Sequence, residues 1–222
     1  MISQIVIWTS LISSIANIVP RLGATTDTSD KVRGHLMAAL CQTVITVWAT
    51  FNLFFTLNIE SLNPFVISYY VYDIGHLLMN PYAKKDRMFI VHHVSTIAII
   101  LYAEAAQFHY DYFYNVIYVL LEGSGIVLNM SGISKSLFPS TTGSRIMMAT
   151  NVATYGLTRI ALYPLHLLYF LYVVLTANPS FFDICIRVPP GLALIALYIV
   201  SVRWYMVMLK RVKETPSLVH EG

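Results

Sequence analysis

Long apolar stretches alternate with short polar connections along the whole chain. We mark seven of them, at approximately 2–20, 35–57, 64–80, 88–106, 112–131, 146–177 and 188–209. Each is near or above the ~20 residues that a helix needs to cross the hydrocarbon core of a bilayer. Because backbone polar groups must be satisfied internally in lipid, these stretches predict helices. The pattern therefore predicts an all-α integral membrane protein with about seven transmembrane helices.

Two of these stretches need comment. The stretch 146–177 is too long for one straight crossing, and Pro164 should kink it, so one kinked helix and two separate segments both remain open. The first stretch begins MISQIVIWTS, without a positively charged n-region or a clear small-residue cleavage site. We expect it to be a retained span rather than a signal peptide.

Composition supports a single membrane domain. Of the 222 residues, 57% are hydrophobic and 11% are charged, whereas soluble domains carry roughly 25% charged residues. A net charge of +3 is too small to suggest nucleic acid, and two cysteines give neither a disulfide framework nor a metal-ligand spacing. We divide the chain into an N-terminal span and linker (1–29), a six-helix membrane domain (30–212) and a short cytosolic tail (213–222). The polar composition of 21–34 predicts a linker there.

The basic residues predict the orientation. With seven spans and the N-terminus outside the cytosol, the cytosolic side carries eleven basic residues and the opposite side only Arg187. This asymmetry fits the positive-inside rule and predicts a cytosolic C-terminus. The eleven residues are Arg21, Lys31, Arg33, Lys84, Lys85, Arg87, Lys135, Arg145, Lys210, Arg211 and Lys213.

Ionisable side chains within the apolar stretches are the strongest functional signal. Each costs roughly 2.5–3.5 kcal/mol on insertion scales, so such groups face a bundle interior or a wet cavity. We therefore expect the helices to surround a central polar cavity. The residues concerned are His35, Asp73, His76, His92, His93, Glu122, Arg159 and His166.

The spacing of these residues predicts which of them share a helix face. Asp73 and His76 lie three residues apart, with Tyr69 one turn before Asp73. Asn115, Glu122 and Asn129 recur every seven residues with Tyr118 between them, and Arg159 and His166 are also seven apart. We expect these stripes to point inward.

Two adjacent histidines occupy the fourth stretch, in MFIVHHVST. Neighbouring helical residues point about 100° apart, so at most one of His92 and His93 can face a central cavity directly. Thr96, one turn beyond His92, favours His92 for that face. The other ring should then lean towards a neighbouring helix.

Histidine can exchange a proton near neutral pH or act as a nucleophile, and a carboxylate can orient it. The catalytic candidates are therefore His92, His93, Asp73 and Glu122. The candidates for substrate binding are His35, Tyr69, His76, Asn129, Arg159 and His166. No HExxH motif or i, i+4 histidine pair appears, so we predict no metal site. The alternative is that these residues hold helices together, at ~0.6 kcal/mol per contact, with Arg159 as structural partner of Glu122 or Asp73.

An ordered set of segments resembles the TLC-domain family, named for translocating-chain-associated, longevity-assurance and ceroid-lipofuscinosis proteins. The set covers roughly residues 30–212 and is most similar to small members without a soluble extra domain. It comprises SDKVRGH ending in His35, YYVYD, DRMFIVHHVST, VLLEGSGIVLN and LTRIALYP. The double histidine followed about thirty residues later by Leu-Leu-Glu…Asn is its most specific part.

The resemblance implies a bundle with a lipid-accessible cavity and a role in lipid metabolism, usually in the endoplasmic reticulum. In the ceramide synthase branch the double histidine belongs to the site that transfers an acyl chain from coenzyme A, which would assign that role to His92 and His93. Acyl-coenzyme A would then be a co-substrate, and no resident cofactor is implied. That branch has a His-Asp pattern on the following helix, where this chain has Glu122, Gly123 and Ser124.

Three functions stay open at this stage. The first is a protein that binds a membrane lipid or fatty acyl chain in its cavity and affects membrane lipid composition, with acyl transfer as one mechanism. The second is a non-catalytic cargo receptor, chaperone or structural membrane protein. The third is a proton-coupled transporter, although the inverted repeats typical of transporters are not evident. The sequence does not indicate an oligomeric state.

Overall fold

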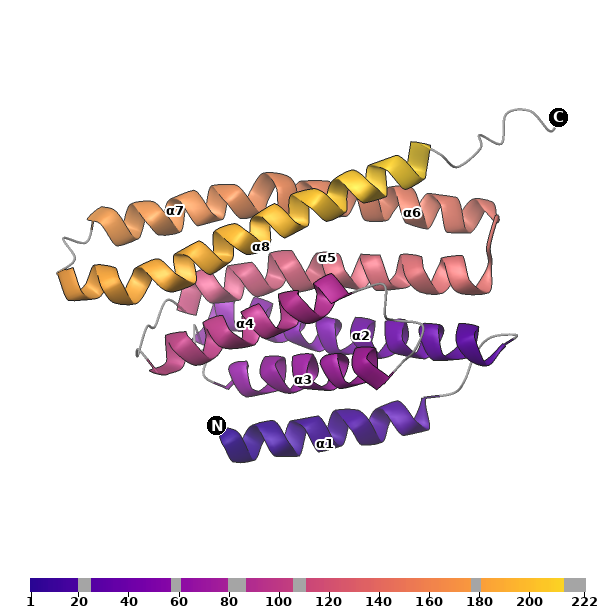
Figure 1. Ribbon diagram of the computed structural model, residues 1–222, viewed down its shortest axis with the longest axis horizontal. Coiled ribbons are helices and arrows are strands. Elements are labelled where there is room, and N and C mark those ends of the chain that lie inside the picture. Colours follow the sequence, from indigo (N-terminus) through magenta and orange to yellow (C-terminus); the bar gives the residue numbers. More distant parts are fainter. Residues whose placement is uncertain (20–24, 57–60, 80–86, 106–110, 177–180, 214–222) are drawn as a thin grey trace.

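In the computed structural model, the described residues form seven helices, and successive helices run in opposite directions (Figure 1). The structure describes residues 1–19, 25–56, 61–79, 87–105, 111–176 and 181–213. Arg21, Lys84 and Lys85, three of the basic residues counted above, and the tail from 214 onwards lie outside these residues. The N- and C-terminal ends of the bundle are opposite, as an odd number of helices requires.

The helices coincide with the seven apolar stretches and confirm the all-α membrane fold. Two of them contain a π-helical segment, labelled η. Their bounds are α1 Ile2–Ile18, α2 Thr26–Phe51 continued by η1 Asn52–Thr56, α3 Asn63–Met79, α4 Arg87–Ala105, α5 Asp111–Leu137, α6 Thr142–Tyr155 continued by η3 Gly156–Leu162 and α7 Tyr163–Thr176, and α8 Phe181–Lys213.

Length and composition suit these helices to a bilayer. In the described residues four helices are long and apolar enough to cross it, at Thr28–Thr56, Asp111–Leu137, Thr142–Val173 and Val188–Val212. Ile2–Ile18 and Phe89–Ala105 are shorter apolar helices, and 17 residues span about 26 Å at the usual rise. Large apolar side chains such as Ile2, Phe54 and Leu192 cover the outside of the bundle. The chain is a multi-pass membrane protein.

The expected linker at 21–34 is wrong for its second half. Residues from Thr26 onward form the first turns of α2, because the Thr25 side chain accepts a hydrogen bond from the backbone N–H of Thr28 at 3.2 Å and caps the helix. The polar residues that predicted a loop instead form the first turns of α2, and the apolar part of the helix follows them.

The long stretch 146–177 is one continuous helix whose middle is π-helical. The N–H of Tyr163 bonds to the carbonyl of Thr158, five residues back, just before Pro164. Buried residues recur here every four positions, at Asn151, Tyr155, Arg159 and Tyr163. A regular α-helix would rotate such a series by about 40° per step. The wider π-turns keep Tyr155, Arg159 and Tyr163 on one inner face.

Glycines allow α2 and α5 to pack closely. A Cβ atom on Gly125 would overlap the side-chain amide of Gln42, and one on Gly132 would lie 2.6 Å from His35 Nε2. Small residues at helix contacts let backbones approach in membrane proteins. We expect Gly125→Ala to lower the melting temperature in detergent, because Gln42 would have to give up its buried hydrogen bond to Asn129.

Gly75 offers a matched control, since a Cβ at that position of α3 meets nothing within 4 Å. Gly75→Ala should leave the melting temperature equal or slightly higher, because alanine is the better helix former by roughly 1 kcal/mol. Equal melting temperatures for the Gly125 and Gly75 variants would contradict the packing role.

Candidate functional site

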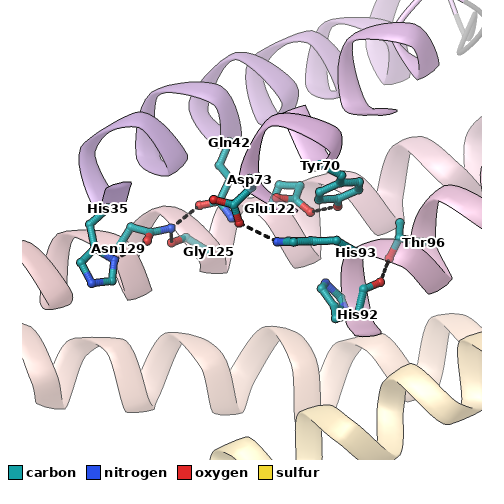
Figure 2. Close-up of polar contacts among 10 residues, drawn as sticks. All are labelled: His35, Gln42, Tyr70, Asp73, His92, His93, Thr96, Glu122, Gly125 and Asn129. Atoms are coloured by element: carbon teal, nitrogen blue, oxygen red, sulfur yellow. Dashed lines mark hydrogen bonds and ion pairs between the residues drawn. The ribbon is translucent and has the colours of Figure 1, made fainter. Parts of the chain in front are cut away.

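The His93 ring turns away from the cavity described below and pairs with a carboxylate on the neighbouring helix α3. His93 Nε2 lies 2.7 Å from Asp73 Oδ2, and the two side chains are 6% and 15% exposed (Figure 2). Because a carboxylate only accepts, Nε2 donates this hydrogen bond. Nδ1 of the same ring is buried and has no hydrogen-bond partner in the described part of the chain. In the neutral ring, Nδ1 therefore carries a lone pair that can accept a proton.

Tyr70 connects this pair to Glu122. Its hydroxyl donates to Glu122 Oε1 at 2.5 Å, and its ring stacks on His93 at a centroid distance of 4.6 Å and an angle of 24°. Glu122 is buried, and its Oε2 finds no partner among the described residues. Of the two carboxylates proposed to orient a histidine, Asp73 contacts one, whereas Glu122 accepts a hydrogen bond from a tyrosine.

Sequence reasoning missed Tyr70. The signal was available, since Tyr70 lies three residues before Asp73 and so shares its helix face. It was hidden by the surrounding tyrosines of YYVYD, of which Tyr69 was selected instead. Tyr69 is buried, and its ring lies edge-on to His93 at 6.1 Å.

The His92 ring points in a different direction from the His93 ring (Figure 2). It lines a small cavity in the bundle. Thr96, also in the lining, donates to the His92 backbone carbonyl at 2.9 Å. The cavity measures about 30 Å³, and most of its wall is apolar. Its lining comprises Tyr70, His92, Thr96, Ile99, Ile100, Tyr114, Ile117, Tyr118, Leu121, Glu122, Leu194 and Leu197.

The surface that faces this cavity is almost entirely apolar. Isoleucines and leucines form much of the lining, and Tyr70, His92 and Glu122 also belong to it. The cavity that the sequence led us to expect as polar is therefore an apolar slot with these three side chains in its wall. Such a slot suits a molecule with a long apolar portion and a small polar group.

His35 and Asn129, two predicted ligand contacts, bond to each other. His35 Nδ1 is 2.8 Å from Asn129 Oδ1, and the Asn129 amide donates to Gln42 Oε1 at 2.8 Å and to the Gly125 carbonyl at 3.0 Å. These bonds join α2 to α5 beside the close glycine contacts (Figure 2). The geometry gives His35 and Asn129 a packing role, and Gln42 was missed.

The other predicted contacts also face protein. Arg159 is 4% exposed and donates from Nε to Ser124 Oγ at 2.8 Å and from Nη2 to the Leu121 carbonyl at 2.6 Å. Its guanidinium lies over the Tyr155 ring at 4.9 Å. In the described structure it therefore bonds neither Glu122 nor Asp73, the two partners considered for it.

His76 and His166 lie apart from the histidine pair. His76 lies against the backbone of α2 at Gly34, and its ring stacks with Tyr72 at 6.3 Å. His166 stacks on Phe113 at 4.7 Å, and its Nε2 is 3.2 Å from the Phe113 carbonyl. Both arrangements are those of packed histidines.

A second polar cluster was not predicted. Tyr118 donates to Asn63 Oδ1 at 2.9 Å, and the Asn63 amide donates to Glu104 Oε1 at 2.5 Å. This cluster joins α3, α4 and α5 towards the other end of the bundle from Asp73. Within the described residues, no three His, Cys, Asp or Glu side chains come together to hold a metal ion.

Comparison with protein families identifies the fold. The family model of the TLC domain matches residues 37–210, most of the chain. The chain belongs to the TLC domain family. No curated protein sequence matches it closely enough to be counted as a relative.

The TLC domain match contains Asp73, both adjacent histidines, Tyr70 and Glu122. It begins two residues after His35, which ends the first segment of the resemblance seen in the sequence, SDKVRGH. The His93–Asp73 and Tyr70–Glu122 contacts are therefore both formed within the TLC domain, whereas α1 lies outside it.

Proposed function

We propose that this TLC domain protein holds a membrane lipid by an acyl chain in the cavity between α3, α4, α5 and α8, and thereby affects membrane lipid composition. The observation that carries the proposal is the meeting of an apolar slot with His92, Tyr70 and Glu122, groups that are costly to bury. The apolar walls match the chemistry of an acyl chain, for which the slot would have to widen, and a carbonyl, hydroxyl or amine of the lipid would bind beside His92, Tyr70 and Glu122.

Acyl transfer is the chemistry we propose for this site. His92 would take the proton from an acceptor hydroxyl or amine, whose oxygen or nitrogen then bonds to the acyl carbon of an acyl-coenzyme A. The carbon–sulfur bond breaks, and the coenzyme A thiol leaves with the proton. His93 would support this step from its position on Asp73, with the two imidazoles 5.4 Å apart.

We propose an endoplasmic reticulum location, with the N-terminus in the lumen and the C-terminus in the cytosol. The basic residues support this orientation, since Lys31, Arg33, Lys135, Arg145 and Lys210 belong to the helix ends on the side of the C-terminus. His92 and His93 follow the start of α4 at Arg87 by only one to two turns. They would then lie within reach of a head group from the cytosolic leaflet.

A second candidate function is a non-catalytic lipid carrier or chaperone. This function is favoured because several predicted substrate-binding residues form hydrogen bonds to other protein groups, namely His35, Asn129, Arg159 and His166. Fewer polar groups are then available for catalysis than the sequence suggested. In this case the cavity would bind lipid without changing it.

Mass spectrometry of co-purified lipid tests the proposal. We expect the purified protein to retain an acyl-chain lipid and His92→Ala to reduce its amount about tenfold, the effect of losing about 1.4 kcal/mol of binding. Asn151→Ala, at a buried polar site outside the cavity lining, should retain the wild-type amount. Absence of lipid from the wild-type protein, or equal retention by all three proteins, would refute the proposed binding site.

The same variants separate the two candidate functions. If His92→Ala alters the cellular lipid profile and abolishes acyl transfer from added acyl-coenzyme A, the protein is an enzyme. If lipid is retained by the wild-type protein but no transfer occurs with any acceptor, the carrier function is the better description.

A further inference from the structure

The helices α4 and α8 pack against each other and both contribute to the cavity lining. From α4 it is lined by His92, Thr96, Ile99 and Ile100, and from α8 by Leu194 and Leu197. We call the contact between these two helices the α4–α8 seam. Both helices also carry exposed apolar side chains, among them Val91 of α4 and Ile199 of α8, which suit contact with lipid chains.

Hydrogen bonds hold each of these helices to a different part of the bundle. α4 is bonded to α3 by His93–Asp73 and by Glu104–Asn63. α8 is bonded to the helix of residues 142–176, through the Tyr163 hydroxyl on the Leu194 carbonyl at 2.9 Å and the Asn151 amide on Met208 Sδ at 3.3 Å. None of these hydrogen bonds joins α4 to α8, and the contacts described between them are those of aromatic rings.

Trp204 makes the main aromatic contacts across the seam. Its ring stacks on Phe89 of α4 at 4.5 Å and meets the His92 ring edge-on at 5.8 Å. The indole thus packs against the histidine that lines the cavity.

The size of the cavity requires that something move. A volume of about 30 Å³ accommodates a few water-sized groups but not an acyl chain. Pro189 and Pro190 remove two backbone donors from α8 about one turn before Leu194, which weakens the helix there and permits it to bend. The α4–α8 seam can therefore widen where α8 bends.

We propose that a single unbranched acyl chain enters the cavity between α4 and α8, and that it displaces the Trp204 indole from His92 as it does so. This inference rests on the proposed lipid-binding function and adds to it the route and the positioning residue. Before the chain enters, Trp204 packs against His92. With lipid bound, its ring lies alongside the chain.

Fluorescence quenching tests the route. We would use a variant with Trp204 as its only tryptophan (Trp8→Phe, Trp48→Phe), delipidated in detergent and titrated with a dibrominated stearic acid. Saturable quenching is expected, because bromine quenches an indole only at close range. A protein that keeps only Trp8, which packs on Phe65 away from the cavity lining, should show only weak, non-saturating quenching.

Two leucine variants of α8 provide the matched comparison. Leu197→Phe fills the cavity and should weaken the saturable quenching at least about tenfold, whereas Leu192→Phe adds the same bulk on the outward side, where Leu192 is 61% exposed, and should change nothing. Melting temperatures would show that each variant is folded.

The outcomes separate this inference from the proposed function. If lipid co-purifies and Leu197→Phe removes it, yet Trp204 is quenched no more than Trp8, the chain binds but enters elsewhere and only the route is wrong. If neither co-purified lipid nor saturable quenching is found, the proposed function fails together with the route.

Discussion

Replacing Asp73 with asparagine is expected to abolish acyl transfer, or to reduce it at least about a hundredfold, in a protein that still folds. The carbonyl oxygen of the introduced amide could still accept the hydrogen bond from His93 Nε2, which the carboxylate accepts at 2.7 Å. What is lost is the negative charge that stabilises a protonated imidazole and fixes its tautomer. A hundredfold lower rate corresponds to the loss of about 2.7 kcal/mol of transition-state stabilisation.

The variant should be compared with Asp73→Leu. Leucine cannot accept the hydrogen bond, so it leaves His93 buried with no partner at either ring nitrogen and should also lower the melting temperature. Transfer activity would be measured with a panel of amine and alcohol acceptors, alongside thermal unfolding. If Asp73→Asn retains full activity while Asp73→Leu is unstable, the His93–Asp73 pair is structural only.

Replacing Tyr70 with phenylalanine is expected to destabilise the protein clearly, although the volume of the side chain hardly changes. It removes the hydroxyl that donates to Glu122 Oε1 and preserves the ring that stacks on His93. Glu122 would then have no donor in the described surroundings, because Oε2 already has none. Leaving a buried group without its hydrogen bond costs roughly 2–3 kcal/mol when an ionisable group is involved.

Tyr118→Phe is the matched control. The Tyr118 hydroxyl is equally buried but donates to the neutral Asn63, so its loss should cost about 1 kcal/mol. In the double variant Tyr70→Phe/Glu122→Leu, most of the lost stability should return, because no unpaired carboxyl remains. Equal destabilisation by the two phenylalanine variants, measured by thermal unfolding in one detergent, would contradict the account of Glu122.

The hydrophobic pattern was sufficient to predict the number and order of the helices, since only long helices satisfy the backbone in lipid. It failed at the start of α2, where the threonine cap extends the helix into polar sequence. Spacing also predicts which residues share a face within a helix. It correctly separated His92 from His93, whose rings diverge.

The spacing of residues along the sequence does not predict which helix each face will pack against. Asp73 could be placed beside His76 by their three-residue separation, yet its partner is His93 on another helix. Contacts between helices also account for the positions of Tyr70, Gln42 and Trp204. In the sequence alone, these three residues cannot be distinguished from ordinary packing residues. Arg159 shows the converse, since a charged residue proposed for substrate binding, or for pairing with a carboxylate, bonds a hydroxyl and a backbone carbonyl.

The π-helical segment Gly156–Leu162 has a consequence for how this helix tolerates change in length. Its wide turns take up about one residue more than regular α-helical winding would over the same rotation. Deleting one residue there would therefore restore regular winding and leave the residues beyond it on nearly the same faces, with Tyr163, His166 and Phe170 still turned towards α8 and α5. The same deletion in the regular turns of α7 before His166 would rotate all later residues by about 100° and turn His166 and Phe170 away from α5. The π-helical segment is thus a place where this helix can lose a residue without moving α8 away from the cavity that His92 lines.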